Sequence, residues 1–229
     1  MKLYQKIPIQ DCGEPLVEIP LADFAVVMPH PYAMLGAPYG DRGPYFLRQS
    51  VLDRLYQAQG WLQVQRPGWR LQIFDAYRPV AVQQFMVDYT FEQLARSHDL
   101  DPAALTPAQQ TDLQSQVFQF WAPPSPDPAT PPPHSTGAAV DLTLADAEGM
   151  QVNMGSAIDE LSPRSYPNYF AESAEPEEQQ YNRDRALLSQ AMTQAGFCQH
   201  PHEWWHFSQG DQLWAWTAQA QIARYGGAV

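Results

Sequence analysis

Two short motifs, far apart in the chain, carry the side chains of a metal site, so the fold must bring them together. The first runs from His134 to Asp141 and the second from Glu203 to His206. Two imidazoles and one carboxylate form the ligand set of a catalytic zinc ion, whose fourth position stays open for water. A carboxylate then remains to act as a base. The pattern indicates zinc-assisted chemistry.

Spacing alone leaves the ligands of the second motif open, because His200 and His202 compete with His206. In a helix, residues i and i+3 share a face, whereas in a strand they point to opposite faces. The tryptophan-rich run at 204–207 favours a strand. A bulge or a turn is therefore required if Glu203 and His206 are to meet one ion. We expect structural or surface roles for His200 and His202.

Asp141 lies in a predicted strand at 139–144, facing away from an apolar row of side chains. A carboxylate in such a strand must be paired or metal-bound unless that face is partly exposed. Gly137 allows the preceding turn to fold His134 back over it. His30 and His98 have no partner in the sequence, and we expect them to be solvated.

Arg78 follows a predicted strand at 71–74 and precedes Pro79, at a position where strand ends present side chains. A guanidinium group supplies fixed donors for a developing oxyanion or a substrate carboxylate. An ion pair with Asp75 is the alternative interpretation.

Hydrophobic periodicity divides the chain into helices and short strands. Apolar residues recur every four positions in 43–60 and predict a helix that stops at Gly60. The run 106–109 has the N-cap threonine, proline and glutamine of a helix start. Further helices are predicted after Pro79, at 177–195 and at 213–225. This order lacks a βαβ rhythm and indicates an α+β fold, with a small antiparallel sheet surrounded by helices.

Residues 122–133 contain seven prolines, which exclude a helix or a central strand. A linker between two domains is one interpretation. Because His134 follows directly, we favour a loop that delivers the first metal ligand. We therefore expect one catalytic domain over residues 1–229.

The composition is globular and acidic, with 45% hydrophobic residues and a formal net charge of -12. No run of basic residues is present, which argues against nucleic acid or an anionic membrane as a partner. Cys12 and Cys198 form no C-x-x-C pair, so a thiolate zinc site is excluded and free thiols are favoured over a disulfide. No secretory signal or apolar span is visible, and we expect a cytoplasmic protein.

Four motifs in order along the chain resemble the VanX-type D-alanyl-D-alanine dipeptidases. The resemblance covers roughly residues 15 to 210, and its motifs are Asp75-Ala76-Tyr77-Arg78-Pro79, the run 134–144, Met154-Gly155 with Asp159, and Glu203-Trp204-Trp205-His206. It implies the compact α+β fold shared with zinc D,D-carboxypeptidases and the hedgehog signalling domain.

The resemblance also assigns roles to residues. It implies one zinc ion bound by His134, Asp141 and His206, with Glu203 as general base and acid. Arg78 would stabilise the tetrahedral intermediate. We further expect substrate contacts from two residues, Asp159 and Ser135.

The implied reaction is hydrolysis of D-Ala-D-Ala, with a small dipeptide as the partner. A D,D-carboxypeptidase that trims longer peptidoglycan stems is the nearer alternative, and a non-catalytic zinc-binding module is the more distant one. The presence of Glu203 and Arg78 argues against the non-catalytic module, since a structural zinc site needs neither a base nor an oxyanion donor. Pro132 stands where the family usually has a serine that helps to hold the substrate. The sequence favours neither glycopeptide resistance nor D-alanine recycling, and it does not indicate an oligomeric state.

Overall fold

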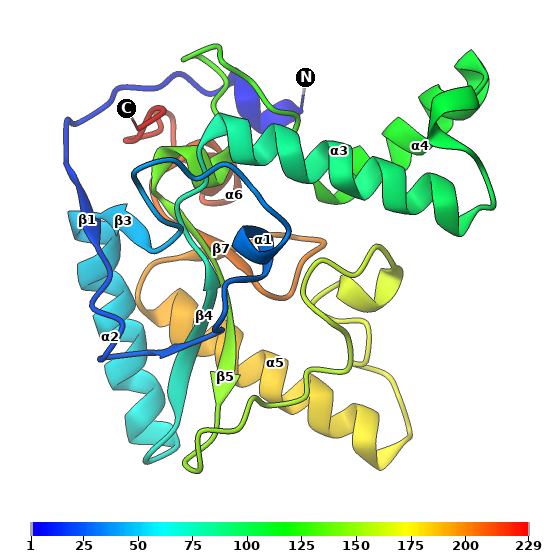
Figure 1. The fold of residues 1–229 in the computed structure, drawn as a ribbon. Helices are drawn as coiled ribbons and strands as arrows, with labels where there is room; N and C mark the ends of the chain where they lie inside the picture. Colours follow the sequence, from blue (N-terminus) through cyan, green and yellow to red (C-terminus); the bar gives the residue numbers. More distant parts are fainter. Residues whose placement is uncertain (1, 229) are drawn as a thin grey trace.

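A five-stranded sheet forms the centre of the computed structural model, which describes residues 2–228 (Figure 1). The strand order is β2-β4-β5-β7-β6, and a separate two-stranded sheet pairs β1 with β3. The strands are β1 (Leu16–Glu18), β2 (Ala25–Val26), β3 (Phe46–Arg48), β4 (Arg70–Asp75), β5 (Ala139–Ala145), β6 (Cys198–Gln199) and β7 (His206–Ser208). All pairings are antiparallel except that of β2 with β4. The predicted α+β class is confirmed.

The register of this sheet assembles charged side chains from three strands. Asp75 pairs with Asp141 across β4 and β5, after a register shift that follows Ile73. Asp141 in turn pairs with His206 across β5 and β7. Directly opposed residues in neighbouring strands have Cβ atoms only about 5 Å apart. Residues distant in sequence therefore meet at one place.

Helices α2 and α5 pack beside the sheet and close the main core (Figure 1). Leu71 and Ile73 of β4 and Leu142 and Leu144 of β5 are fully buried. Burying each such side chain contributes roughly 1.5–3 kcal/mol. The helices are α1 (Pro31–Met34), α2 (Gln49–Gln65), α3 (Val80–Ser97), α4 (Pro107–Phe120), α5 (Pro176–Gln194) and α6 (Gln212–Thr217), with short 3-10 helices η1 (Leu3–Lys6), η2 (Pro102–Ala104), η3 (Pro133–Thr136) and η4 (Pro163–Ser165).

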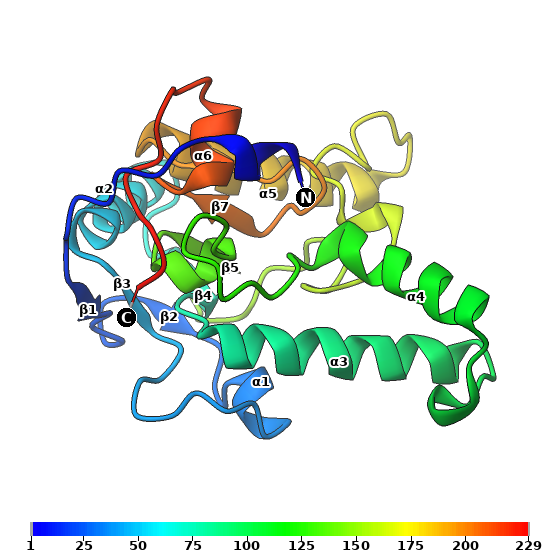
Figure 2. The ribbon, with the colours of Figure 1, turned by 90° about the horizontal axis from the view of Figure 1, so that it is seen from above.

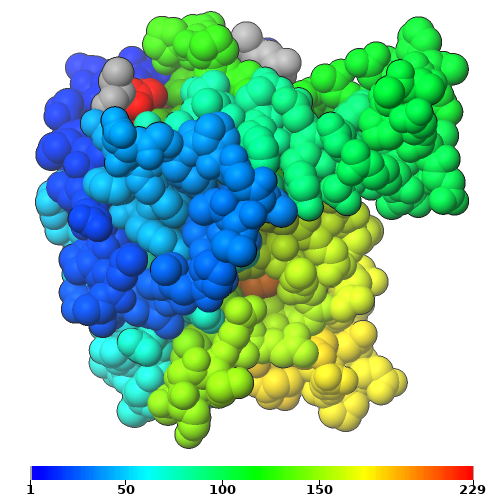
Figure 3. Space-filling model, viewed as in Figure 1, coloured from blue at the N-terminus to red at the C-terminus, as the bar shows by residue number. Residues whose placement is uncertain are grey.

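Helices α3 and α4 lie side by side and form an arm that stands away from the sheet (Figure 2 and Figure 3). A second apolar cluster holds this arm together and includes Tyr32, Val82, Val117 and Trp121. Trp121 caps the C-terminus of α4 and lines the same pocket as His134 and His206, so the base of the arm forms one wall of that pocket.

The proline-rich segment 122–133 connects α4 to η3 without regular structure until Pro133. Gln83 of α3 donates to Ala122 O and Gln212 of α6 to Ala129 O, so the segment is held at both ends. Gly137 then turns the chain into β5 with a φ of 71°. A Cβ at this position would collide with Leu16, so the turn requires glycine.

Three predicted helix boundaries are wrong. The helix predicted at 43–60 begins only at Gln49, because Phe46–Arg48 pair with β1 as β3. Gly60 lies inside α2, which runs on to Gln65, because the apolar face continues to the buried Leu62. The terminal helix ends at Thr217, well before the predicted end at 225. Instead, Ala223 forms a bridge with Ile9, so the C-terminal segment packs against the N-terminal one.

Two further observations concern cysteines and hydropathy. Cys12 and Cys198 are both free thiols in the part of the chain that the structure describes. Within residues 2–228, none of the helices combines the length and hydropathy needed to cross a bilayer.

Candidate active site

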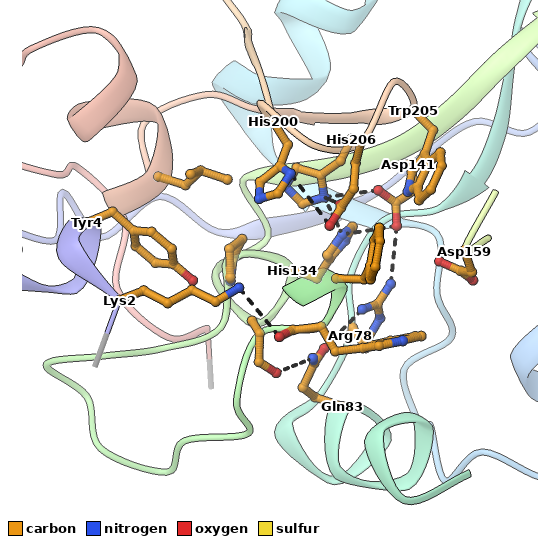
Figure 4. A pocket seen from close by; sticks show the side chains of 16 residues that line it. Lys2, Tyr4, Arg78, Gln83, His134, Asp141, Asp159, His200, Trp205 and His206 are labelled. Atoms are coloured by element: carbon orange, nitrogen blue, oxygen red, sulfur yellow. Dashed lines mark hydrogen bonds and ion pairs between the residues drawn. The ribbon is translucent and has the colours of Figure 1, made fainter. Parts of the chain in front are cut away.

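His134, Asp141 and His206 converge in a buried cluster whose potential ligand atoms all lie within 4.8 Å of one another. His134 Nε2 is 3.1 Å from His206 Nδ1 and 3.2 Å from Asp141 Oδ2. His206 Nδ1 is 3.0 Å from Asp141 Oδ1. Figure 4 shows the three side chains pointing toward one another.

In each histidine, the ring nitrogen that faces away from the cluster has a hydrogen-bond partner. The nitrogen that faces into the cluster is therefore left to bind a metal. His134 Nδ1 lies 2.6 Å from Ala76 O, and because a carbonyl only accepts, this nitrogen carries the proton. His206 Nε2 lies 3.3 Å from Ser208 Oγ. Metal-bound histidines almost always use their second nitrogen in this way. Two inward lone pairs and a carboxylate at such short separations fit a shared cation.

The ionisation of the cluster also suits a metal. Burial alone would raise the pKa of Asp141, but the adjacent His134 and His206 hold that pKa well below its usual range. Burial lowers the pKa of His206, which keeps this imidazole neutral and able to donate a lone pair.

Glu203 lies in the turn that precedes β7, with Oε2 3.8 Å from His206 Nδ1. The strand begins at His206 and not at Trp204, and this turn lets Glu203 and His206 face the same point. The predicted turn is confirmed, while the predicted strand at 204–207 starts too early. Burial and the nearby Asp141 raise the pKa of Glu203 well above its usual value. A carboxyl with a raised pKa is suited to accept a proton and then return it.

Arg78 is buried and its guanidinium group is held from several sides. Nε donates to Asp75 Oδ2 at 2.9 Å, Nη1 to Gln83 Oε1 at 2.9 Å and Nη2 to Asp141 Oδ2 at 3.2 Å. The rings of Tyr32 and Trp121 lie 5.1 and 5.0 Å from its central carbon. Arg78 therefore forms the ion pair with Asp75 and also lines the pocket.

Asp159 lies at the opposite wall from the N-terminal segment and accepts a hydrogen bond from Tyr32 Oη at 2.5 Å. Its φ is 64°, an uncommon backbone conformation for a residue other than glycine. Burial and the charge of Asp141 raise the pKa of Asp159 to about 7.

One pocket brings most of the predicted residues together: Arg78, His134, Asp141, Asp159, Glu203 and His206 all line it. Ser135 does not line it, because its hydroxyl donates to Arg78 O at 2.7 Å and points back into the fold. The pocket is small, about 40 Å³, and shares five residues with an outer hollow of about 430 Å³.

Several pocket residues were not identified from the sequence. They include Lys2, Tyr4, Gln83 and Trp121. His200, for which a structural or surface role was expected, also lines the pocket. His200 Nδ1 lies 3.5 Å from Glu203 Oε1, whereas His202 is exposed, and neither belongs to the three-residue metal cluster. For Gln83, the sequence offers one signal, which is a polar residue within the apolar stripe of α3. Lys2 and Tyr4 belong to no motif.

The expectation that His30 is solvated is wrong. It is buried, its Nε2 lies 3.1 Å from Asp75 Oδ1, and its Nδ1 accepts from Ala33 N at the start of α1. It thus supports the carboxylate that holds Arg78. His98 is exposed, as expected.

The chain is similar in sequence to known peptidases. The family profile described as D-Ala-D-Ala dipeptidase, peptidase M15, matches residues 26–224. A D-alanyl-D-alanine dipeptidase of Synechocystis sp. is 54% identical over 239 residues, covering 99% of this chain and 96% of the relative. A D-alanyl-D-alanine dipeptidase of Escherichia coli is 39% identical over 98 residues, covering 41% of this chain and 48% of the relative.

Among solved structures, the LD-carboxypeptidase LdcB, described in a study of peptidoglycan recognition, matches 87% of this chain and 69% of its own. The identity is 14% and the TM-score 0.44. The match of the family profile and the nearly full-length relative establish the family. This chain belongs to the M15 peptidases, in the family of D-Ala-D-Ala dipeptidases.

Proposed function

We propose that this protein is a zinc-dependent dipeptidase that hydrolyses D-alanyl-D-alanine to two D-alanines. The observation that carries the proposal is the meeting of His134, Asp141 and His206 beside the free carboxyl of Glu203. The identity of 54% to a D-alanyl-D-alanine dipeptidase supports this substrate.

One zinc ion per chain would be held by His134, Asp141 and His206. When bound, it supplies Lewis acidity, which polarises a carbonyl and lowers the pKa of water to about 7. Glu203 takes the proton of the attacking water and then gives it to the leaving amine. Arg78 donates to the negative oxygen of the tetrahedral intermediate. Asp159 faces the free amine of the substrate.

Three broader assignments are part of the same proposal. Residues 1–229 form a single catalytic domain in which 122–133 is an internal loop. The protein works in the cytoplasm. Its substrate is a small dipeptide, and neither nucleic acid nor membrane is a partner.

A substrate panel tests the function. With zinc, we expect the purified protein to release alanine from D-Ala-D-Ala, and almost none from an L,L-dipeptide, an amidated dipeptide or a stem pentapeptide. Polar groups left unpaired by a wrong substrate enforce such discrimination strongly. Comparable rates on the pentapeptide would instead favour a carboxypeptidase. Zinc binding without hydrolysis of any substrate would favour the non-catalytic module.

Arg78 can be tested with two variants, because it serves both the pocket and the fold. Arg78→Lys keeps the positive charge but loses the planar guanidinium group with its fixed donors. We expect turnover to fall by roughly 10²–10³, the contribution of one oxyanion donor. Arg78→Ala should in addition destabilise the protein by roughly 3–5 kcal/mol, because the buried carboxylates of Asp75 and Asp141 lose the guanidinium group that pairs with both. Steady-state kinetics and urea unfolding measure the two effects. A rise in KM alone would make Arg78 a ground-state binding group.

A further inference from the structure

Lys2 places a cation at the mouth of the pocket. It precedes η1 and its side chain lines both the inner pocket and the outer hollow. Among the described residues, its Nζ forms one hydrogen bond, a long one of 3.5 Å to Trp121 O. Within residues 2–228, no carboxylate forms a salt bridge with it. A half-buried ammonium with free donors is an attractive site for an anionic group.

Arg78, the other cation of the pocket, has one N–H of Nη1 left over, and the proposed mechanism already uses that hydrogen for the oxyanion. Its Nε and Nη2 groups are bound to Asp75 and Asp141, and Nη1 is bound to Gln83. Two carboxylates already balance its charge. Among the described residues that line the inner pocket, Lys2 is the cation that remains available to a second anionic group of the substrate.

The charges at the two ends of the pocket are opposite. Figure 4 shows Lys2 on one side of the three metal-site residues and Asp159 on the other. A dipeptide has the same order of groups: a cationic amine, a central amide and an anionic carboxylate. With the amide at the metal site and the amine toward Asp159, the carboxylate points toward Lys2.

The volumes agree with this orientation. A single water needs roughly 10–15 Å³ of space accessible to its centre. The inner pocket, about 40 Å³, thus has room for only part of a dipeptide. The rest must reach toward the outer hollow, and Lys2 lies at the boundary between the two spaces. Pro133, which also lines the pocket, has no side-chain donor for a carboxylate.

We propose that Lys2 binds the free carboxylate of the substrate and so makes the enzyme select a substrate with an unblocked C-terminus. This inference rests on the proposed dipeptidase function. It concerns only the carboxylate end and does not depend on how the amine end is recognised. Lys2 acts by binding the substrate. Its charge also acts on Glu203: burial and Asp141 raise the pKa of that carboxyl, and Lys2 lowers it.

The test compares a free with a blocked carboxylate. The full chain is prepared with any tag at the C-terminus, so that the segment before Lys2 is unaltered. The KM of D-Ala-D-Ala and the inhibition constant of D-Ala-D-Ala amide are measured for the wild type, Lys2→Met and Lys2→Arg. Lys6→Met, which changes an exposed lysine of the same short helix, is the matched control.

In Lys2→Met we expect KM for D-Ala-D-Ala to rise roughly 10- to 100-fold, the usual contribution of a charged hydrogen bond. The amide should bind as to the wild type, and Lys2→Arg should restore most of the affinity. An unchanged KM would overturn the inference, as would an equal loss for the dipeptide and its amide. If the wild type does not hydrolyse D-Ala-D-Ala at all, the proposed function fails instead.

Discussion

His206→Ala is expected to abolish metal binding and peptide hydrolysis together. The substitution removes one of the three proposed ligands and leaves His134 and Asp141 without the third side chain of the cluster. Even an outer partner of a ligand contributes 10–100-fold in metal affinity, so loss of a ligand should cost at least roughly 100-fold. Zinc content should fall from one ion per chain to almost none.

Thermal unfolding gives a readout that is independent of activity. A ligand that binds only the folded state stabilises it by about 4 kcal/mol at a thousandfold excess over Kd. Zinc should therefore raise the Tm of the wild type but not that of His206→Ala. His202→Ala is the matched control, because this histidine lies in the same segment but is exposed. If His202→Ala lost zinc and His206→Ala kept it, the ligand assignment would be wrong.

The two motifs that contain the proposed metal ligands could be recognised in the sequence, because their residue types are uncommon and lie close together along the chain. Thr106, predicted as an N-cap, forms a complete capping box with Gln109, and the strand at 139–144 matches β5 within one residue. These features depend on short-range preferences. The ligand choice at His206, in contrast, depended on a resemblance, since spacing alone also allowed His200 and His202.

Tertiary contacts decide the features that the sequence did not predict. His30 looked solvated because its partner Asp75 is far away in the chain. Lys2 carries no motif, and only the packing of η1 against α6 brings it to the pocket. Gly60 is tolerated within α2, where the apolar face on both sides of it is buried. A glycine costs such a helix only about 1 kcal/mol, which packing readily offsets.

Glu203→Gln is expected to separate catalysis from metal binding. Glutamine has almost the same shape as glutamate but cannot accept the proton of the attacking water. Turnover should fall by roughly 10²–10⁴-fold, the usual contribution of a positioned acid–base group. Zinc content should stay at one ion per chain, since the proposed ligands are untouched.

Glu203→Gln should not lower the stability of the fold, so a loss of turnover can be attributed to the missing base. Burial and Asp141 raise the pKa of Glu203, so the ionised form is unfavourable in the folded protein. A neutral amide removes that cost, and the Tm of the metal-free variant should equal or exceed that of the wild type. Glu172→Gln, an exposed carboxylate, provides the control. Loss of zinc in Glu203→Gln would make this residue a ligand, and turnover within tenfold of the wild type would mean that another group acts as the base.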